Sequence, residues 1–289
     1  MKLAVIGDEV AQDIEVVAEV AAASGAVGVE IRSVADRAPG LLTRPELRRI
    51  RDVLAARGLT VAGYAPPAFK CPIPVTDDDY AVVADELNKF TEQAAVLGAP
   101  HVRIFSFWRD GEPDPIGAAR AAARVLSEVR SDIPLVVETG TRTNTPTMRH
   151  VLEFLEALGF PGLGILWDPG NSVFSGWDPA PFPDDYDAGR TLIRHVHVKD
   201  PAGRTGYVRI GSGDLPWPAI LHRLAEDGYG GYLSLETHWR IGRVLSAQER
   251  DTPWGDDFSR GGRAASAECL GILRTMLDEI PKASLDHER

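Results

Sequence analysis

The chain has 289 residues, of which 44% are apolar and 25% are charged, a composition typical of a globular protein with enough material for a core. Its 31 basic and 42 acidic residues give a net charge of −11, which argues against nucleic-acid and membrane partners because the surface repels phosphate. Two cysteines are too few for a disulfide framework, and no segment approaches the roughly 18 apolar residues of a membrane span. Asp8 and Glu9 interrupt the first apolar stretch, so we expect no signal peptide and a cytoplasmic protein.

Short β-branched runs alternate with longer alanine-rich runs of helical periodicity along the chain, a pattern that predicts repeated βα units. The expected strands are Leu3–Gly7, Val27–Ile31, Leu59–Tyr64, His101–Phe105, Ile133–Glu138, Leu163–Asp168, Ile193–Lys199 and Tyr232–Glu236. The expected helices are Ile14–Ala23, Pro45–Ala56, Asp79–Leu97, Pro115–Val129, Pro146–Leu158, Trp217–Glu226 and Ala264–Leu277. Several of them are predicted to end at a following glycine, namely Gly25, Gly58, Gly98, Gly159 and Gly228.

Eight parallel strands can form an open doubly wound sheet or close into a barrel. After the first strand the chain has Gly7-Asp8-Glu9-Val10 in place of the glycine-rich turn that binds dinucleotides, which favours the barrel. We therefore predict the α/β class and a single (β/α)8 TIM-barrel domain over residues 1–289. A C-terminal helix at about 260–280 packs on this barrel, and the proline-rich stretches at 66–67 and 179–183 are interpreted as loops within it.

Polar side chains stand at the carboxyl ends of the last four predicted strands. They are Glu138, Asp168, His197 and Glu236, separated by 30, 29 and 39 residues, close to one βα unit each. Because the carboxyl ends of barrel strands meet at one mouth, the four groups are expected to converge. His195 shares a strand face with His197, and we select His197 because it lies nearer the carboxyl end.

Three carboxylates and a histidine held together repel one another unless a cation lies between them. Their mixed oxygen and nitrogen donors suit Mn²⁺, Mg²⁺, Co²⁺ or Zn²⁺. The structural alternative is that each acid caps the helix after its strand or pairs with an arginine. Four such residues in register favour the metal site.

Several segments resemble the sugar phosphate isomerase/epimerase family, the xylose-isomerase-like TIM barrels. They are Trp167-Asp168-Pro169-Gly170-Asn171, the strand from His195 to Asp200, Gly211-Ser212-Gly213-Asp214 with Trp217, and Glu236-Thr237-His238-Trp239. The run from Asp8 to Asp13, followed by Val29-Glu30-Ile31-Arg32, is similar to the same family. The resemblance spans nearly the whole chain, and it indicates a family rather than a substrate because this fold hosts several reactions on one metal site.

The resemblance implies that Glu138, Asp168, His197 and Glu236 bind one divalent metal ion, with Mn²⁺ expected ahead of Mg²⁺, Co²⁺ or Zn²⁺. It also implies that Glu138 and Glu236 are the catalytic acid/base groups on opposite faces of a small carbohydrate substrate. Proton transfer then proceeds through a metal-bound enediolate, which makes the expected enzyme an isomerase or epimerase of a sugar, sugar phosphate or keto-polyol. Relatives that form dimers or tetramers suggest a homodimer or homotetramer.

Three loop residues are candidates for substrate binding, each with a plainer alternative. Asn171 stands where many relatives carry a histidine, and its amide can hydrogen-bond a hydroxyl but cannot titrate. Lys70 follows strand three, where it can reach a substrate oxygen or remain solvated. Arg32 follows strand two, where it can bind an anionic group or pair with an acid such as Glu30 or Asp8.

Other candidates lie after strands four, seven and eight. Lys199 can contact substrate, support His197 or form a salt bridge. Trp108 and His238 are also expected to contact substrate, although aromatic residues at strand ends, which here include Phe105, Phe107 and Trp239, often fill the core instead.

Three other functions compete with the isomerase or epimerase. The same proton abstraction can lead to loss of a β-hydroxyl, as in a dehydratase or lyase acting on a keto-sugar or keto-inositol, or to cleavage of a 3-keto-C-glycoside. An endonuclease-IV-type activity uses the same barrel, but the negative charge and few strand-end histidines argue against it. A non-catalytic barrel that binds a sugar is the remaining alternative.

Overall fold

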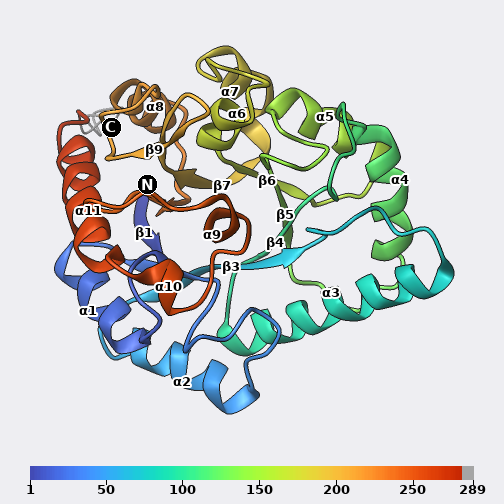
Figure 1. Cartoon of the computed structure of the whole chain (residues 1–289), viewed down its shortest axis with the longest axis horizontal. Coiled ribbons are helices and arrows are strands. Elements are labelled where there is room, and N and C mark those ends of the chain that lie inside the picture. Colours follow the sequence, from blue (N-terminus) through green and yellow to red (C-terminus); the bar gives the residue numbers. More distant parts are fainter. Residues whose placement is uncertain (282–289) are drawn as a thin grey trace, which may run out of the picture.

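The structure is a computed structural model that describes residues 1–281. The predicted domain runs to residue 289, and its last residues, 282–289, lie outside the described residues. Eight parallel strands close into a barrel in the order β1-β10-β7-β6-β5-β4-β3-β2, which confirms the α/β class and the TIM barrel (Figure 1). The strands are β1 (Lys2–Ile6), β2 (Gly28–Ile31), β3 (Thr60–Ala68), β4 (Val102–Ile104), β5 (Leu135–Glu138), β6 (Gly164–Trp167), β7 (Ile193–Val198) and β10 (Tyr232–Leu235). β1 pairs with β10 and β2, so the first and last barrel strands are neighbours.

Helices surround the barrel, and their ends follow local sequence signals. They are α1 (Ile14–Ala23), α2 (Arg44–Ala55), α3 (Asp77–Leu97), α4 (Pro115–Leu126), α5 (Met148–Leu158), α8 (Trp217–Glu226) and α11 (Gly262–Asp278). Thr76 and Asp79 form a capping box at the start of α3, which satisfies free backbone N–H groups there. Gly98 and Gly159 end α3 and α5 in the left-handed conformation, as the sequence predicts.

One loop prediction is wrong, because Pro66 and Pro67 lie inside β3. The register between β3 and β4 shifts after Tyr64, so that Ala68 pairs with Ile104 while Tyr64 pairs with Val102. Proline has no N–H for a strand ladder and is tolerated at such an irregularity. The shift therefore lets the strand continue through both prolines toward the mouth of the barrel.

Short elements that the periodicity did not predict lie in the connections between the barrel strands. They are the 3-10 turns η1 (Gly7–Glu9) and η2 (Arg190–Leu192), the helices α6 (Pro169–Ser175), α7 (Asp184–Gly189), α9 (Ala247–Asp251) and α10 (Asp256–Ser259), and the hairpin of β8 (Asp200–Ala202) and β9 (Gly206–Val208). Among them η2 directly precedes β7, at the amino end of that strand. Figure 1 shows α9 over the middle of the barrel, between β10 and α11 in sequence. This connection, residues 236–261, covers the mouth, and we call it the covering segment.

The C-terminal helix α11 packs against α1, α8, β1 and β10. Its first residue, Gly262, lies against η1, where an added Cβ would be 2.1 Å from the carbonyl oxygen of Glu9. Only a residue without a side chain allows this approach. Within residues 1–281, none of the helices has an apolar stretch long enough to cross a membrane.

Candidate active site

Four strands bring the predicted ligand residues together at the carboxyl end of the barrel. Glu138 is the last residue of β5, Asp168 follows β6, His197 lies in β7 and Glu236 follows β10. All four side chains are buried, and one potential ligand atom of each lies within 4.8 Å of the others. The chain therefore gathers residues that are distant in sequence into one cluster that could hold a metal ion.

The Nδ1 atom of His197 lies at the centre of this cluster. It is 3.6 Å from Glu138 Oε1, 3.6 Å from Asp168 Oδ2 and 3.4 Å from Glu236 Oε2. Among the residues that the structure describes, His197 Nδ1 has no hydrogen-bond partner, and the close polar contact of Asp168 Oδ2 is its ion pair with Lys199. Buried polar atoms without partners are costly unless an ion or ligand satisfies them. One nitrogen and three carboxylate oxygens are also donors that suit Mn²⁺ or a similar divalent ion, so the residues fit a metal.

The second oxygen of each carboxylate is held by the protein. Glu138 Oε2 accepts from Arg103 Nη1 at 2.9 Å, and Glu236 Oε1 pairs with Arg32. Asp168 Oδ1 accepts from the backbone N–H of Asn171 at 3.0 Å and so caps α6. The arginine pairs and the helix cap that the sequence offered as alternatives therefore both occur, on the oxygens that face away from His197.

Glu30 orients His197 from below the cluster. Its two carboxylate oxygens each lie 3.1 Å from His197 Nε2, and one of them lies 2.9 Å from His195 Nε2. A carboxylate only accepts, so this contact holds the proton on Nε2 and leaves Nδ1 of His197 directed at the three acids. Burial opposes a charge on His197, but Glu30 and the three acids raise its pKa well above the usual value. The carboxylate–histidine pair is the arrangement that supports histidine ligands in metal sites.

Lys199 supplies a buried positive charge to two of the same oxygens. Its Nζ atom lies 2.7 Å from Asp168 Oδ2 and 2.5 Å from Glu236 Oε2. Burial opposes this charge, but the two carboxylates raise the pKa of Lys199 well above the usual value. The salt bridge that the sequence offered for Lys199 thus forms with candidate ligands, so any metal bound there shares two carboxylates with an ammonium group.

A second network supports Glu236 from the side of β10. Glu9 accepts from His238 Nδ1 at 2.6 Å, from Arg240 at 3.0 Å and from Arg32 at 3.1 Å. Burial raises the pKa of Glu9, but its contacts with His238, Arg240 and Arg32 lower it below the usual range. His238 has a φ of 47°, a strained conformation for a residue with a side chain, and its Nε2 lies 3.8 Å from Glu236 Oε1. Glu9 therefore holds the imidazole beside the candidate acid/base residue.

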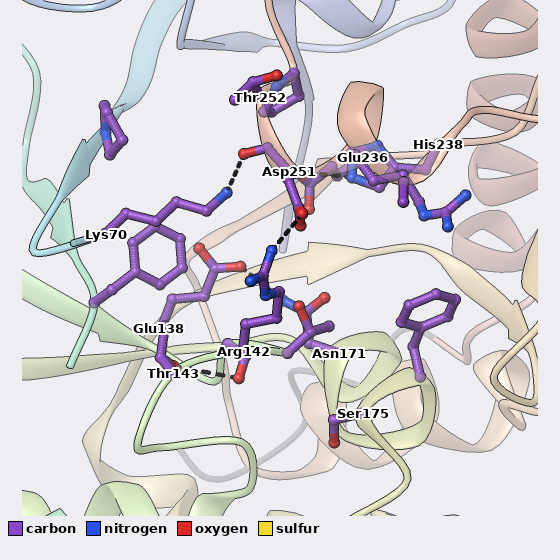
Figure 2. Close-up of a pocket in the computed structure, with 18 of the residues that line it drawn as sticks. Lys70, Glu138, Arg142, Thr143, Asn171, Ser175, Glu236, His238, Asp251 and Thr252 are labelled. Carbon is purple, nitrogen blue, oxygen red and sulfur yellow. Dashed lines mark hydrogen bonds and ion pairs between the residues drawn. The ribbon is translucent and has the colours of Figure 1, made fainter. Parts of the chain in front are cut away.

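A cavity of about 750 Å³ opens above the cluster (Figure 2). All the predicted substrate-binding residues line it, together with Glu138 and Glu236; they are Arg32, Lys70, Trp108, Asn171, Lys199 and His238. Phe105 also lines the cavity, whereas Phe107 is buried against Phe69 and Trp239 packs against the core. Asn171 donates from Nδ2 to Glu138 Oε1 at 2.9 Å, so its amide contacts a candidate catalytic carboxylate directly.

Some residues of the site were missed by the sequence reasoning. Arg103 was not singled out, and Glu9 and Glu30 were noted only within motifs or, for Glu30, as a partner for Arg32. Of the two acids expected beside Arg32, Asp8 does pair with it, and Glu9 and Glu236 pair with it as well. A signal was present, since Arg103 and Glu30 are charged residues inside short apolar strands. Buried charges require partners, so such positions point to the interior of a site.

Comparisons with known proteins agree with this architecture. The family model described as xylose isomerase-like TIM barrel matches residues 18–260. The chain belongs to this family. This chain is also 32% identical over 91 residues to the uncharacterized protein MJ1311 of Methanocaldococcus jannaschii, a match that spans 31% of this chain and 31% of that protein.

The same barrel is found in solved structures of enzymes with different activities. An L-ribulose 3-epimerase has a TM-score of 0.72 and 19% identity, with 96% of this chain and 94% of that chain covered. The 3-keto-D-glucoside 4-epimerase YcjR from E. coli has a TM-score of 0.69 and 17% identity, covering 95% and 99%. The probable 3-DHS dehydratase AsbF from Bacillus anthracis has a TM-score of 0.66 and 15% identity, covering 95% and 99%. At these identities the likeness establishes the fold.

Proposed function

We propose that this protein is a divalent-metal-dependent isomerase or epimerase of a ketose, a keto-polyol or a derivative of one. The observation that carries the proposal is the arrangement around the buried His197 Nδ1, which has no hydrogen-bond partner among the described residues and on which three carboxylate oxygens converge. The epimerases among the structural neighbours support the same class of reaction. A homodimer or homotetramer stays a prediction.

The proposed metal ligands are Glu138, Asp168, His197 and Glu236. A divalent ion held by them, with Mn²⁺ expected first, would stabilise the negative charge that develops on a substrate oxygen when the neighbouring C–H proton leaves. His197 must be neutral to act as a ligand, so metal binding would release a proton from the imidazole.

The proposed acid/base pair is Glu138 and Glu236. Burial opposes their ionisation, but Arg103 at Glu138 and Lys199 at Glu236 lower both pKa values, so both groups are carboxylates at neutral pH. One of them can therefore accept the proton from carbon, while the other must first gain a proton before it can donate on the opposite face. Asn171 holds the Glu138 carboxylate in place for this transfer.

Elimination is the second candidate reaction, and His238 favours it. The imidazole is fixed by Glu9 and lies 3.8 Å from Glu236, where it can protonate a leaving β-hydroxyl after a glutamate has removed the α-proton. A dehydratase is also among the structural neighbours. The product distinguishes the reactions, because elimination releases water whereas isomerisation and epimerisation conserve the formula.

The test measures bound metal per chain after equilibration with Mn²⁺ in wild type, Glu236→Gln and the control Glu156→Gln. Glu156 is exposed on α5, so its substitution changes the same chemistry far from the cluster. We expect about one ion per chain in wild type and the control, and clearly weaker binding in Glu236→Gln. The absence of bound metal in wild type would refute the proposed site, and about three zinc ions would favour the nuclease alternative.

A second measurement tests the chemistry. Wild type, Glu138→Gln and Glu236→Gln are incubated with a panel of ketoses in D₂O, and deuterium on carbon is followed by NMR and mass spectrometry. We expect exchange in wild type with at least one ketose and its loss in both variants. Full exchange in both variants would contradict the acid/base assignment.

A further inference from the structure

The cavity is positively charged although the whole chain has a net charge of −11. Eight arginine and lysine residues line it, against three acids. The cations are Arg32, Lys70, Arg103, Arg109, Arg142, Lys199, Arg204 and Arg250, and the acids are Glu138, Glu236 and Asp251. A cavity lined by one sign of charge concentrates ligands of the opposite sign.

The deep cations are already matched by acids. Arg103 pairs with Glu138, and Lys199 pairs with Asp168 and Glu236. Arg32 lies between Glu236 and the acids of η1. The excess positive charge therefore lies nearer the mouth, on Lys70 and the four other arginines.

Asp251 is the acid among the described cavity residues that lies at this mouth, at the end of α9. Its carboxylate Oδ2 lies 2.5 Å from Arg142 Nη1, and its backbone carbonyl accepts from Lys70 Nζ at 2.8 Å. Figure 2 shows Lys70 and Arg142 reaching from different sides toward Asp251, with Glu138 and Asn171 nearby. One residue of the covering segment thus supplies the oxygens that two cavity cations contact.

The pair of Arg142 and Asp251 is suited to exchange. The Arg142 side chain is 60% exposed and that of Asp251 is 39% exposed. Ion pairs with such exposure contribute little to stability, so another anion can replace the Asp251 carboxylate at small cost. The Asp251 carboxylate therefore occupies the position at Arg142 where the anionic group of a ligand could bind.

Like charges are also held together beside this pair. Arg109 donates to the carbonyl oxygens of Thr141 and Thr143, at 2.6 and 3.3 Å. Burial and the charges of Arg142 and Arg204 lower the pKa of Arg109, and Glu112 opposes that shift. Arg204 lines the same cavity as Arg109 and Arg142. An anion bound here would relieve the repulsion among the three guanidinium groups.

We propose that the substrate carries an anionic group, a carboxylate or a phosphate ester, which binds Arg142 and Lys70 in place of Asp251, in the cavity that Arg109 and Arg204 also line. This inference rests on the proposed function, because the cavity that takes the anion is the one above the acid/base pair. It narrows the substrate class to acidic ketoses, such as keto-sugar acids or ketose phosphates. Loss of the Arg142 contact also frees the end of α9 to move with substrate.

The test uses two small anions as probes of the metal-free protein, so that binding to a metal ion does not contribute. Inorganic phosphate and malonate are titrated by calorimetry at constant ionic strength into wild type, Arg142→Gln, Asp251→Asn and Arg120→Gln. Arg120 is exposed on α4 and does not line the cavity, so Arg120→Gln controls for the change in net charge. The two probes distinguish a phosphate site from a carboxylate site.

We expect at least one probe to bind wild type and the control equally, and to bind Arg142→Gln about tenfold more weakly. Asp251→Asn should bind the same probe several-fold more tightly, because the competing charge is gone. Equal binding to wild type and Arg142→Gln, or no binding of either probe, would overturn the inference. Metal binding and deuterium exchange with neutral ketoses would survive that result, whereas loss of metal binding with intact phosphate binding would refute the proposed function alone.

Discussion

Replacing Glu30 by glutamine tests how the protein orients His197. The carboxylate of Glu30 accepts from His195 at 2.9 Å and from His197 at 3.1 Å. A glutamine oxygen in the place of Oε2 can still accept from both imidazoles, but the NH₂ group then stands where Oε1 lies 3.1 Å from His197 Nε2, and the negative charge is gone. A donor at that position opposes the N–H of His197 and favours an unprotonated Nε2. The proton of His197 is then favoured on Nδ1, the atom that faces the three candidate ligand carboxylates.

The size of the effect follows from these contacts. Outer partners of histidine ligands change metal affinity by about 10- to 100-fold. That range corresponds to about 1.4–2.8 kcal/mol. Loss of one hydrogen bond to a charged group contributes about 1.5–3 kcal/mol, which is a similar amount. We therefore expect Glu30→Gln to raise the Mn²⁺ dissociation constant about 10- to 100-fold.

The assay is calorimetric titration of Mn²⁺ into wild type, Glu30→Gln and the exposed control Glu156→Gln, with circular dichroism to verify the fold. Glu156→Gln removes the same charge from the surface of α5 and should bind Mn²⁺ like wild type. If folded Glu30→Gln bound Mn²⁺ with the wild-type affinity, the proposed role of Glu30 in orienting His197 as a ligand would be wrong.

Three further predictions concern packing and pH. Gly262→Ala should lower the free energy of unfolding in urea by about 1–3 kcal/mol, because its Cβ would meet a backbone atom 2.1 Å away. Gly271→Ala lies in the same helix, where its Cβ has open space, and should leave the stability unchanged or raise it. Equal effects of the two substitutions would contradict this packing argument. Burial and nearby arginines lower the pKa of Lys70 to about 8, so malonate affinity should fall as the pH rises through 8 and the lysine loses its charge. If malonate affinity fell over the same pH range in Lys70→Met, this lysine would not be the titrating group. Burial raises the pKa of Asp185 to about 7. Its protonated form therefore stabilises the folded state fully at pH values below the pKa of an unfolded aspartate, and this stabilisation is lost as the pH rises through about 7. Asp185→Asn should reduce the change of the urea unfolding midpoint with pH over that range. If the midpoint varied with pH as in wild type, Asp185 would not be the titrating group.

The covering segment and the cation contacts were not predictable from local patterns. Residues 247–251 form a helix of five residues, too short to show helical periodicity, and their contacts over the mouth are with Lys70 and Arg142, which lie 181 and 109 residues away in the sequence. Similarly, Arg32 reaches Glu236 across 204 residues of sequence, and Glu30 reaches His195 across 165. Strand alternation assigns a side chain to a face, but it does not say which distant side chain shares that face.

The sequence by itself determined the repeated βα units, the glycines that end helices and the positions of Glu138, Asp168, His197 and Glu236 near strand ends. Those features are local, since periodicity and turn residues act over a few residues and parallel strands of a barrel share one mouth. Only the tertiary structure decided which oxygen of each acid faces His197, and which is held by an arginine or a helix N-terminus. That choice depends on closure of the barrel, because the partners come from strands that meet only when the sheet is complete.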